Sequence, residues 1–279
     1  MGALTDFQAV KNSIEKGRPY SFVKNSITGN TTRLMSYYAQ APNAGATPST
    51  AVTCNAASPF ALLQEPEYTS LNNYFLTQAE LAVGVNTSSI FTSLMLIDRL
   101  SHQGGLSGTV TTAQTTNLPT AALPRYTSGE GVMMALEIYT SVGSTTAANA
   151  TVSYTNQAGV SGRTSKIVIL GGTTDFAASR FIILPLQDDD TGVRSVQSVT
   201  LSANTGSAGN FGVTLFKPLS LFPSFSQAFD GIQPRTFNTL IGGFGCCPEI
   251  LNDACLGLLG FANSTNPGVI TGAFYLAEA

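Results

Sequence analysis

His102 is the sole histidine in the chain, so any catalytic site that relies on an imidazole base must be built around it. The residue follows Ser101 and precedes Gly104-Gly105, which places it where a strand is expected to end in a turn. A histidine-activated serine of the esterase type stands in a Gly-x-Ser-x-Gly turn, and the sequence contains no such motif. General-base catalysis also needs a positioned partner. We therefore interpret His102 as a structural or interface hydrogen-bonding residue.

Asp188, Asp189 and Asp190 form the densest acidic cluster, and carboxylate oxygens are ligands for Ca²⁺. Consecutive strand residues point to opposite sides, so at most two of these carboxylates share a site unless a turn gathers them. The ligand spacing of an EF-hand loop is absent. We favour a hairpin tip in which the Asp side chains bond to their own backbone, and the question of a bound cation stays open.

Cysteine chemistry would have to come from Cys54, Cys246, Cys247 and Cys255. Adjacent Cys246 and Cys247 do not easily ligate one tetrahedral metal, and their spacing to Cys255 matches no zinc pattern. We predict buried reduced thiols, with no metal site and no cofactor. Such a chain is expected to be made in a reducing cytoplasm.

Paired carboxylates of a glycosidase could be drawn from acidic residues such as Glu130 and Glu137, but nothing in the sequence brings two of them together. The chain has no tryptophan, a residue on which sugar-binding surfaces often depend. It also has no Gly-rich phosphate-binding loop followed by Lys-Ser/Thr. We expect no catalytic residues and predict that the chain is not an enzyme.

Charged residues make up only 10% of the 279 residues, whereas about 25% is typical of soluble domains. Surface charge keeps proteins dispersed, and the centres of protein interfaces are poor in Lys, Glu and Asp, so we infer that much of the surface is covered by neighbouring subunits. The alternative is an extracellular Ser/Thr-rich β protein. The net charge of −3 and the lack of a basic stripe predict no specific nucleic-acid partner. No apolar run approaches the about 20 residues of a membrane helix, and residues 1–20 do not resemble a secretory signal.

The hydrophobic pattern predicts a short helix at residues 4–15, where Phe7, Val10 and Ile14 recur at three- and four-residue steps. Residues 41–59 are small, polar and Pro-punctuated, which predicts an exposed arm. A second helical stretch is expected at residues 67–81.

From about residue 90 the hydrophobic period changes to two, and Gly-rich turns separate the segments. No long helix intervenes to allow parallel crossovers, so the fold class predicted is mainly β, an antiparallel β-sandwich or jelly roll. The expected strands are residues 93–100, 132–139, 150–155, 166–170, 181–186, 195–203 and 211–216.

The last part of the chain is apolar and nearly uncharged. We expect a helix at residues 248–261 and a closing strand at 270–276, in a C-terminal helix-containing extension that completes the core or docks into a neighbouring subunit. The predicted organisation is an N-terminal helix and extended arm at 1–60, a β-sandwich core at 61–223, and an apolar extension at 224–279.

The central region, residues 96–219, resembles structural proteins of tailed bacteriophages, of the capsid decoration or cement type. The most specific phrases are YTNQAGVSGRT at residues 154–164 and DTGVRSVQSVTLS at residues 190–202. The resemblance implies a place on the capsid surface of a virion and repeated copies in a symmetric assembly, with cyclic trimers as one form.

Composition and resemblance together predict a non-enzymatic cement subunit that binds other copies of itself and the phage major capsid protein. Alternatives are another head component, such as the major capsid protein itself, or a tail or baseplate receptor-binding protein that recognises a cell-surface glycan. A capsule-depolymerising enzyme ranks last. The residues expected to make subunit contacts are Phe7, Val10, Ile14, Phe216, Phe222, Phe225, Leu240 and Phe244.

Overall fold

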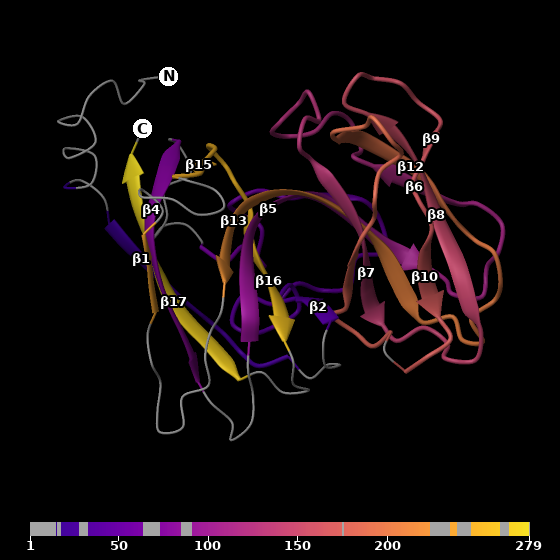
Figure 1. Ribbon diagram of the computed structural model, residues 1–279, viewed down its shortest axis with the longest axis horizontal. Coiled ribbons are helices and arrows are strands. Elements are labelled where there is room, and N and C mark those ends of the chain that lie inside the picture. Colours follow the sequence, from indigo (N-terminus) through magenta and orange to yellow (C-terminus); the bar gives the residue numbers. More distant parts are fainter. Residues whose placement is uncertain are drawn as a thin grey trace.

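The computed structural model shows a chain built from antiparallel strands (Figure 1). Every element formed by the described residues is a β-strand. The structure describes residue 15 and residues 18–27, 33–63, 73–84, 91–174, 176–223, 235–238, 247–262 and 268–278.

A central sheet, sheet B, is wound so far that its two edges meet. Its strands in spatial order are β11 (Phe181–Ile183), β7 (Met133–Thr140), β13 (Asn210–Pro223), β5 (Phe91–Leu106), β16 (Leu256–Ala262) and β2 (Arg33–Ser36), with β3 (Val52–Thr53) also on β5. The edges β2 and β11 approach through a bridge between Met35 and Arg180 and through Ser36 N–H, which donates to Ser179 O at 2.7 Å. Sheet B is therefore a small, nearly closed barrel.

Two further sheets flank the barrel, and Figure 1 shows them at its left and right. Sheet A consists of β1 (Arg18–Lys24), β17 (Val269–Glu278), β4 (Tyr74–Gly84) and β14 (Arg235–Asn238), with β15 (Glu249–Ile250) on β4. Sheet C consists of β10 (Val168–Gly171), β8 (Ala147–Asn156), β12 (Val193–Leu201) and β6 (Gln114–Leu118), with β9 (Arg163–Thr164) on β8.

The outer surface of the barrel supplies one side of two separate hydrophobic cores. Leu94 and Leu96 of β5 pack with Phe274 of β17 in the core under sheet A. Leu136 of β7 and Val213 of β13 pack with residues of β8 and β12 in the core under sheet C. The long strands β5 and β13 take part in both cores, so they join the two halves of the molecule.

The inside of the barrel follows from the alternation of side chains along its strands. All of its strands except β3 contribute to one internal apolar cluster, which comprises Ile97, Ala135, Phe181, Phe216 and Leu259 with Leu34, Met95, Met133 and Ile183 packed against it. Arg99, Glu137 and Ser36 lie two residues beyond Ile97, Ala135 and Leu34 on their strands, so a polar layer is stacked on the apolar one.

The predicted fold class is wrong in two respects, because three sheets are present and the expected C-terminal helix at residues 248–261 is absent. Those residues form β15 and β16. Leu256 and Leu258 of β16 face the core under sheet A, while Leu259 faces the barrel interior. A strand buried on both faces gives a continuous apolar run, which periodicity does not distinguish from a buried helix.

The second expected helix, at residues 67–81, is also wrong where it is described, because residues from Tyr74 onward form β4. Leu76 and Ala79 are both fully buried although they are three residues apart. A register shift between β4 and β17 lies between them, and this irregularity mimics helical spacing. The predicted N-terminal helix at residues 4–15 lies outside the described residues except for Glu15.

The ends of the chain take part in the sheets where they are described. Residues 41–59, which were expected to form an exposed arm, include the fully buried Cys54 and Ala56. β17 pairs with both β1 and β4 at the centre of sheet A. The division of the chain at residues 60 and 223 stays a prediction. Among the described residues there is no helix long and apolar enough to cross a membrane.

Candidate functional site

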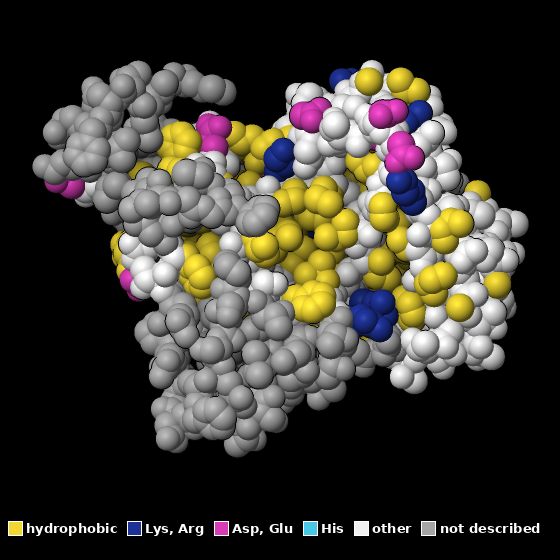
Figure 2. Space-filling view, viewed as in Figure 1, with side chains coloured by type: hydrophobic (Ala, Val, Ile, Leu, Met, Phe, Trp, Pro, Cys, Tyr) yellow, Lys and Arg dark blue, Asp and Glu magenta, His cyan; other side chains and the backbone are white. Residues whose placement is uncertain are grey.

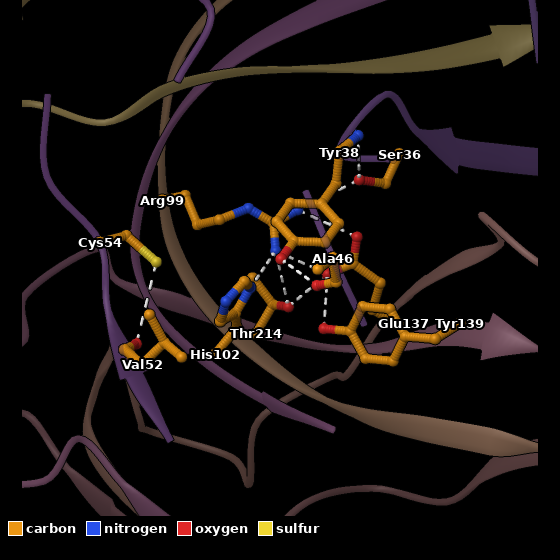
Figure 3. Close-up of polar contacts among 10 residues, drawn as sticks. All are labelled: Ser36, Tyr38, Ala46, Val52, Cys54, Arg99, His102, Glu137, Tyr139 and Thr214. Carbon is orange, nitrogen blue, oxygen red and sulfur yellow. Dashed lines mark hydrogen bonds and ion pairs between the residues drawn. The ribbon is translucent and has the colours of Figure 1, made fainter. Parts of the chain in front are cut away.

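The polar layer inside the barrel contains buried ionisable side chains, and Figure 3 shows it in close-up. Arg99 comes from β5, Glu137 from β7, Thr214 from β13 and Ser36 from β2. These strands are far apart in sequence, so only the winding of sheet B brings the four side chains together.

Arg99 and Glu137 form a bidentate ion pair at the centre of this layer. Arg99 Nη1 and Nη2 donate to Glu137 Oε2 and Oε1 at 2.7 and 3.0 Å. Thr214 Oγ1 donates to Glu137 Oε2 at 2.6 Å, and Arg99 Nη2 also donates to Ser36 Oγ at 3.1 Å. The two charged side chains are only 4% and 2% exposed. The cost of removing both charges from water is therefore offset by their bidentate geometry and by hydrogen bonds.

The electrostatics of Glu137 follow from this pairing. Burial alone would raise the pKa of its carboxyl, because a charge is poorly solvated in the interior. The charge and hydrogen bonds of Arg99, with the hydroxyl of Thr214, outweigh burial and lower the pKa of Glu137 to about 2. Glu137 is therefore a carboxylate at neutral pH, which disqualifies it as a proton donor there.

His102 joins the same layer because β5 is irregular. The register between β5 and β13 shifts between Leu215 and Phe216, so Thr214 pairs with His102 while Phe216 pairs with Arg99. This bulge turns Arg99 and His102 to the same side although they are three residues apart. Arg99 Nη1 lies 3.0 Å from His102 Nδ1.

The contact with Arg99 defines the state of the imidazole. An arginine has no acceptor, so His102 Nδ1 accepts and the ring hydrogen resides on Nε2. Among the described residues, Nε2 is buried and has no hydrogen-bond partner. Burial and the neighbouring charge of Arg99 lower the pKa of His102 to about 3, so the ring is neutral at physiological pH.

Aromatic side chains cover this end of the barrel. Arg99 Cζ lies 4.5 Å from the centre of the Tyr38 ring, in a cation–π contact. Rings of Tyr38 and Phe60 pack on His102 at 4.9 and 5.2 Å between centroids. Tyr38 Oη donates to Ala46 O at 2.7 Å, which ties the covering segment to itself. Residues 37–63 thus close the polar end of the barrel.

A second buried ion pair begins at the preceding residue, Asp98. Arg125 Nε and Nη2 donate to Asp98 Oδ2 and Oδ1, each at 2.7 Å, and Cys255 N–H donates to Asp98 Oδ1 at 3.0 Å. Arg125 Nη2 also donates to Cys54 O at 3.0 Å. Asp98 thereby connects β5 to Arg125, whereas the adjacent Arg99 connects β5 to Glu137 of β7.

A small cavity lies beside the polar layer and is lined by residues that include Lys24, Tyr37 and Arg99. Its volume of about 10 Å³ is room for about one water molecule. Lys24 Nζ donates to the carbonyls of Gln40, Pro42 and Asn43 at 3.1, 2.8 and 2.8 Å. Burial lowers the pKa of Lys24 to about 8.

The polar layer stabilises the fold of the barrel. His102 faces a guanidinium and two aromatic rings, and Glu137 is held by Arg99 and Thr214. A buried ion pair that is fully hydrogen-bonded specifies which strands are neighbours and in which register. The polar layer therefore favours one order and one register of the barrel strands.

His102 makes a hydrogen-bond contact with Arg99, and its interpretation as a structural or interface hydrogen-bonding residue stays a prediction. Its expected position at the end of a strand is wrong, because β5 continues to Leu106. Arg99 and Arg125 were not singled out from the sequence. The signal that could have found Arg99 is the charged pair Asp98-Arg99 directly after the apolar run at residues 94–97.

The acidic cluster at the tip of sheet C is held by side chains of the chain itself. Asp190 accepts hydrogen bonds from Tyr154 Oη at 2.5 Å, Asn156 Nδ2 at 2.6 Å and Arg163 Nε at 2.9 Å. Asp188 pairs with Lys166. Within the part of the chain that the structure describes, no group of three His, Cys, Asp or Glu side chains could hold a metal ion.

Two of the residues expected at subunit contacts are buried inside this chain. Phe216 is fully buried and packs on Phe181, with ring centroids 5.2 Å apart. Phe222 is 1% exposed and packs between Phe237 and Phe274. Both side chains therefore belong to the core of this chain as described. The others lie outside the described residues, namely Phe7, Val10, Ile14, Phe225, Leu240 and Phe244.

Comparison with known proteins establishes no family. No protein-family model matches the chain, and no curated protein does. Among solved structures, it is similar to that of the infectious bursal disease virus Gx strain, with 9% identity, a TM-score of 0.20, and coverage of 94% of this chain and 81% of the other. The VP2 subviral particle of the same virus gives 11% identity, a TM-score of 0.22 and coverage of 94% and 81%. At these TM-scores neither likeness establishes a shared fold.

Proposed function

We propose that the chain is a non-enzymatic structural subunit of a virus particle, which binds and stabilises a phage capsid as a cement or decoration protein. Its partners would be other copies of itself, in a cyclic trimer, and the major capsid protein. The observation that carries the proposal is the small number of charged side chains on the surface of the folded chain.

The chain has few charged residues, and folding buries some of them. The chain has 13 Lys and Arg and 16 Asp and Glu in 279 residues. Among the described residues, some of these charges are buried, namely Lys24, Asp98, Arg99, Arg125 and Glu137. Figure 2 shows one face of the molecule, on which the charged side chains gather mainly at the upper right, over sheet C, and few lie elsewhere. Such a surface supports assembly, because interface centres are depleted of charge.

Exposed apolar side chains mark where a neighbour could bind. Figure 2 shows hydrophobic side chains gathered in the middle of that face, between sheet A and sheet C. At the edge of sheet C, Ile167 and Ile169 are 59% and 48% exposed, the former just before β10 and the latter within it. An edge strand with exposed apolar side chains is a site where a second chain can pack or extend the sheet.

The polar layer of the barrel fits the same function. A subunit that reinforces a shell performs no turnover and benefits from a rigid framework. The Arg99–Glu137 pair fastens β5 to β7, and Ser36 connects β2 to it. These contacts hold the barrel while the flanking sheets present their outer faces.

The direct test is co-sedimentation of the purified chain with empty heads of the phage that encodes it. We expect saturable binding and a higher temperature of shell disruption. The double variant Ile167→Glu with Ile169→Glu should bind at least about 10-fold more weakly, as expected when charge enters an interface core. Val160→Glu is the matched control, because Val160 is 51% exposed and lies in the loop between β8 and β9 of the same sheet. Failure of the unmodified chain to bind heads would overturn the proposal.

The same preparation separates the other candidate functions. Selective binding to one glycan on an array, without binding to heads, would favour a tail or baseplate receptor-binding protein. Self-assembly of the chain alone into closed shells would identify a major capsid protein.

A further inference from the structure

Cys54 and Cys255, which lie near opposite ends of the chain, meet on the same edge of β5. Cys54 N–H donates to Leu100 O at 2.9 Å, and Arg99 N–H donates to Cys255 O at 2.8 Å. β13 occupies the other edge of β5, so β3 and β16 must share this one. The two strands therefore meet end to end at the two cysteines.

The side chains of these cysteines share one environment. Both are fully buried, and they belong to the same small cluster as Tyr38, Phe60 and Ala61. Cys54 is among the groups that raise the pKa of the Cys255 thiol, so the two side chains lie near each other. Cys54 Sγ also lies 3.8 Å from Val52 O (Figure 3). Two buried cysteines of one cluster, on backbones hydrogen-bonded to adjacent residues of one strand, are spatial neighbours, as a disulfide requires.

We propose that Cys54 and Cys255 form an intramolecular disulfide when the chain folds in the presence of a low-molecular-weight disulfide such as oxidised glutathione. One cysteine thiolate attacks the glutathione disulfide and releases one reduced glutathione. The second thiolate then attacks the mixed disulfide and releases another. The two cysteines lose two protons and two electrons, and oxidised glutathione takes up both. This inference does not depend on the proposed capsid function.

The surroundings decide when the bond can form. Burial makes the largest contribution and the neighbouring Cys54 side chain the next, and both raise the pKa of the Cys255 thiol well above its ordinary value. A protonated, enclosed thiol reacts slowly, so oxidation occurs during folding or when residues 37–63 open from the barrel. Once formed, the bond would be shielded from reductants for the same reason.

The disulfide would close the loop between residues 54 and 255, which includes sheet C and most of the barrel. A cross-link over so long a loop restricts the unfolded chain strongly. We expect the oxidised protein to unfold at a temperature about 5–10 °C higher than the reduced protein.

The test uses the full-length chain, refolded with oxidised and reduced glutathione, quenched with an alkylating reagent and analysed by intact mass and peptide mapping. We expect a mass lower by two hydrogen atoms and a linked peptide pair that contains Cys54 and Cys255. The variant with Cys246→Ser and Cys247→Ser is the matched control and should form the same link.

Cys54→Ser should lose the link and the difference in unfolding temperature between oxidised and reduced protein. If that variant does not fold, mapping of the unmodified chain still decides. Refolded protein in which Cys54 and Cys255 are both alkylated, or are linked to Cys246 or Cys247, would overturn the inference.

Discussion

The interior of the barrel and the tip of sheet C both hold ion pairs, but in opposite surroundings. The side chains of Arg99 and Glu137 are 4% and 2% exposed, whereas those of Lys166 and Asp188 are 54% and 83% exposed. In the interior, loss of one partner leaves a charge that water does not reach. At the tip, water replaces the lost partner. The location of a pair therefore decides its effect on stability more than its hydrogen-bond distances do.

Removal of the charge of Glu137 is expected to have the largest effect. Glu137→Gln leaves Arg99 buried without a counter-ion, and we expect the free energy of unfolding to fall by about 3–5 kcal/mol. Urea denaturation measures the loss. The matched control is Asp188→Asn at the exposed pair, and equal losses for the two variants would erase the distinction between the regions.

Acid should also lower the free energy of unfolding, because it protonates Glu137. The pKa of Glu137 is about 2 in the folded chain and takes its ordinary value of 4.5 when unfolded. A lowered pKa contributes stability that is present above pH 4.5 and is lost as the pH falls towards 2. Denaturation curves between pH 6 and pH 2 should show this decline for the unmodified chain. The slope should be shallower in Glu137→Gln, and parallel curves would contradict the assignment.

His102 adds a second acid-sensitive contribution over a different range. Its pKa is about 3 when folded against an ordinary 6.5, so protonation favours the unfolded chain as the pH falls from 6.5 towards 3. The variant His102→Gln, which keeps an acceptor for Arg99, should lose the decline between pH 6.5 and 4.5.

Replacement of both partners in the interior should be milder than removal of one. In Arg99→Met with Glu137→Leu no charge is left unpaired, and we expect a loss of less than about 2 kcal/mol. Thr214 and Ser36 lose their partners in this variant, so some loss remains. A double variant less stable than Glu137→Gln would mean that the ion pair itself stabilises the barrel. The cost of an unpaired buried charge would then not be the main effect.

The smallest effect is expected at the exposed pair. Lys166→Ala should change the free energy of unfolding by no more than about 0.5 kcal/mol, because both side chains are solvated. The difference should vanish in 1 M salt, which screens exposed charges. A loss above 1 kcal/mol in thermal or urea unfolding would place this pair in the same class as the buried one.

Strands in which large apolar residues alternate with other residues could be predicted from the sequence, and the polar layer could not. The alternation at residues 132–139 identified β7, because Met134, Leu136 and Ile138 all face one core. β16 was mistaken for a helix because the adjacent Leu258 and Leu259 are buried on opposite faces, which removes the alternation of apolar and polar residues. The number of sheets follows from pairings between distant strands, which local periodicity does not encode.

The components of the polar layer were equally hidden. Glu137 was noticed only as one acidic residue among many, and its partner Arg99 is 38 residues away. A bulge in β5 places Arg99 and His102 on one side, against the simple alternation that a sequence suggests. Glu137 and Arg99 become neighbours only through the strand register.

Light scattering of the purified chain, over a range of concentrations and of salt up to 1 M, tests the central claim most directly. A subunit with a charge-poor, apolar contact surface should form a defined oligomer that persists at high salt, because screening weakens only charge-based contacts. A monodisperse monomer at every concentration and salt level would contradict assembly as the function of this chain.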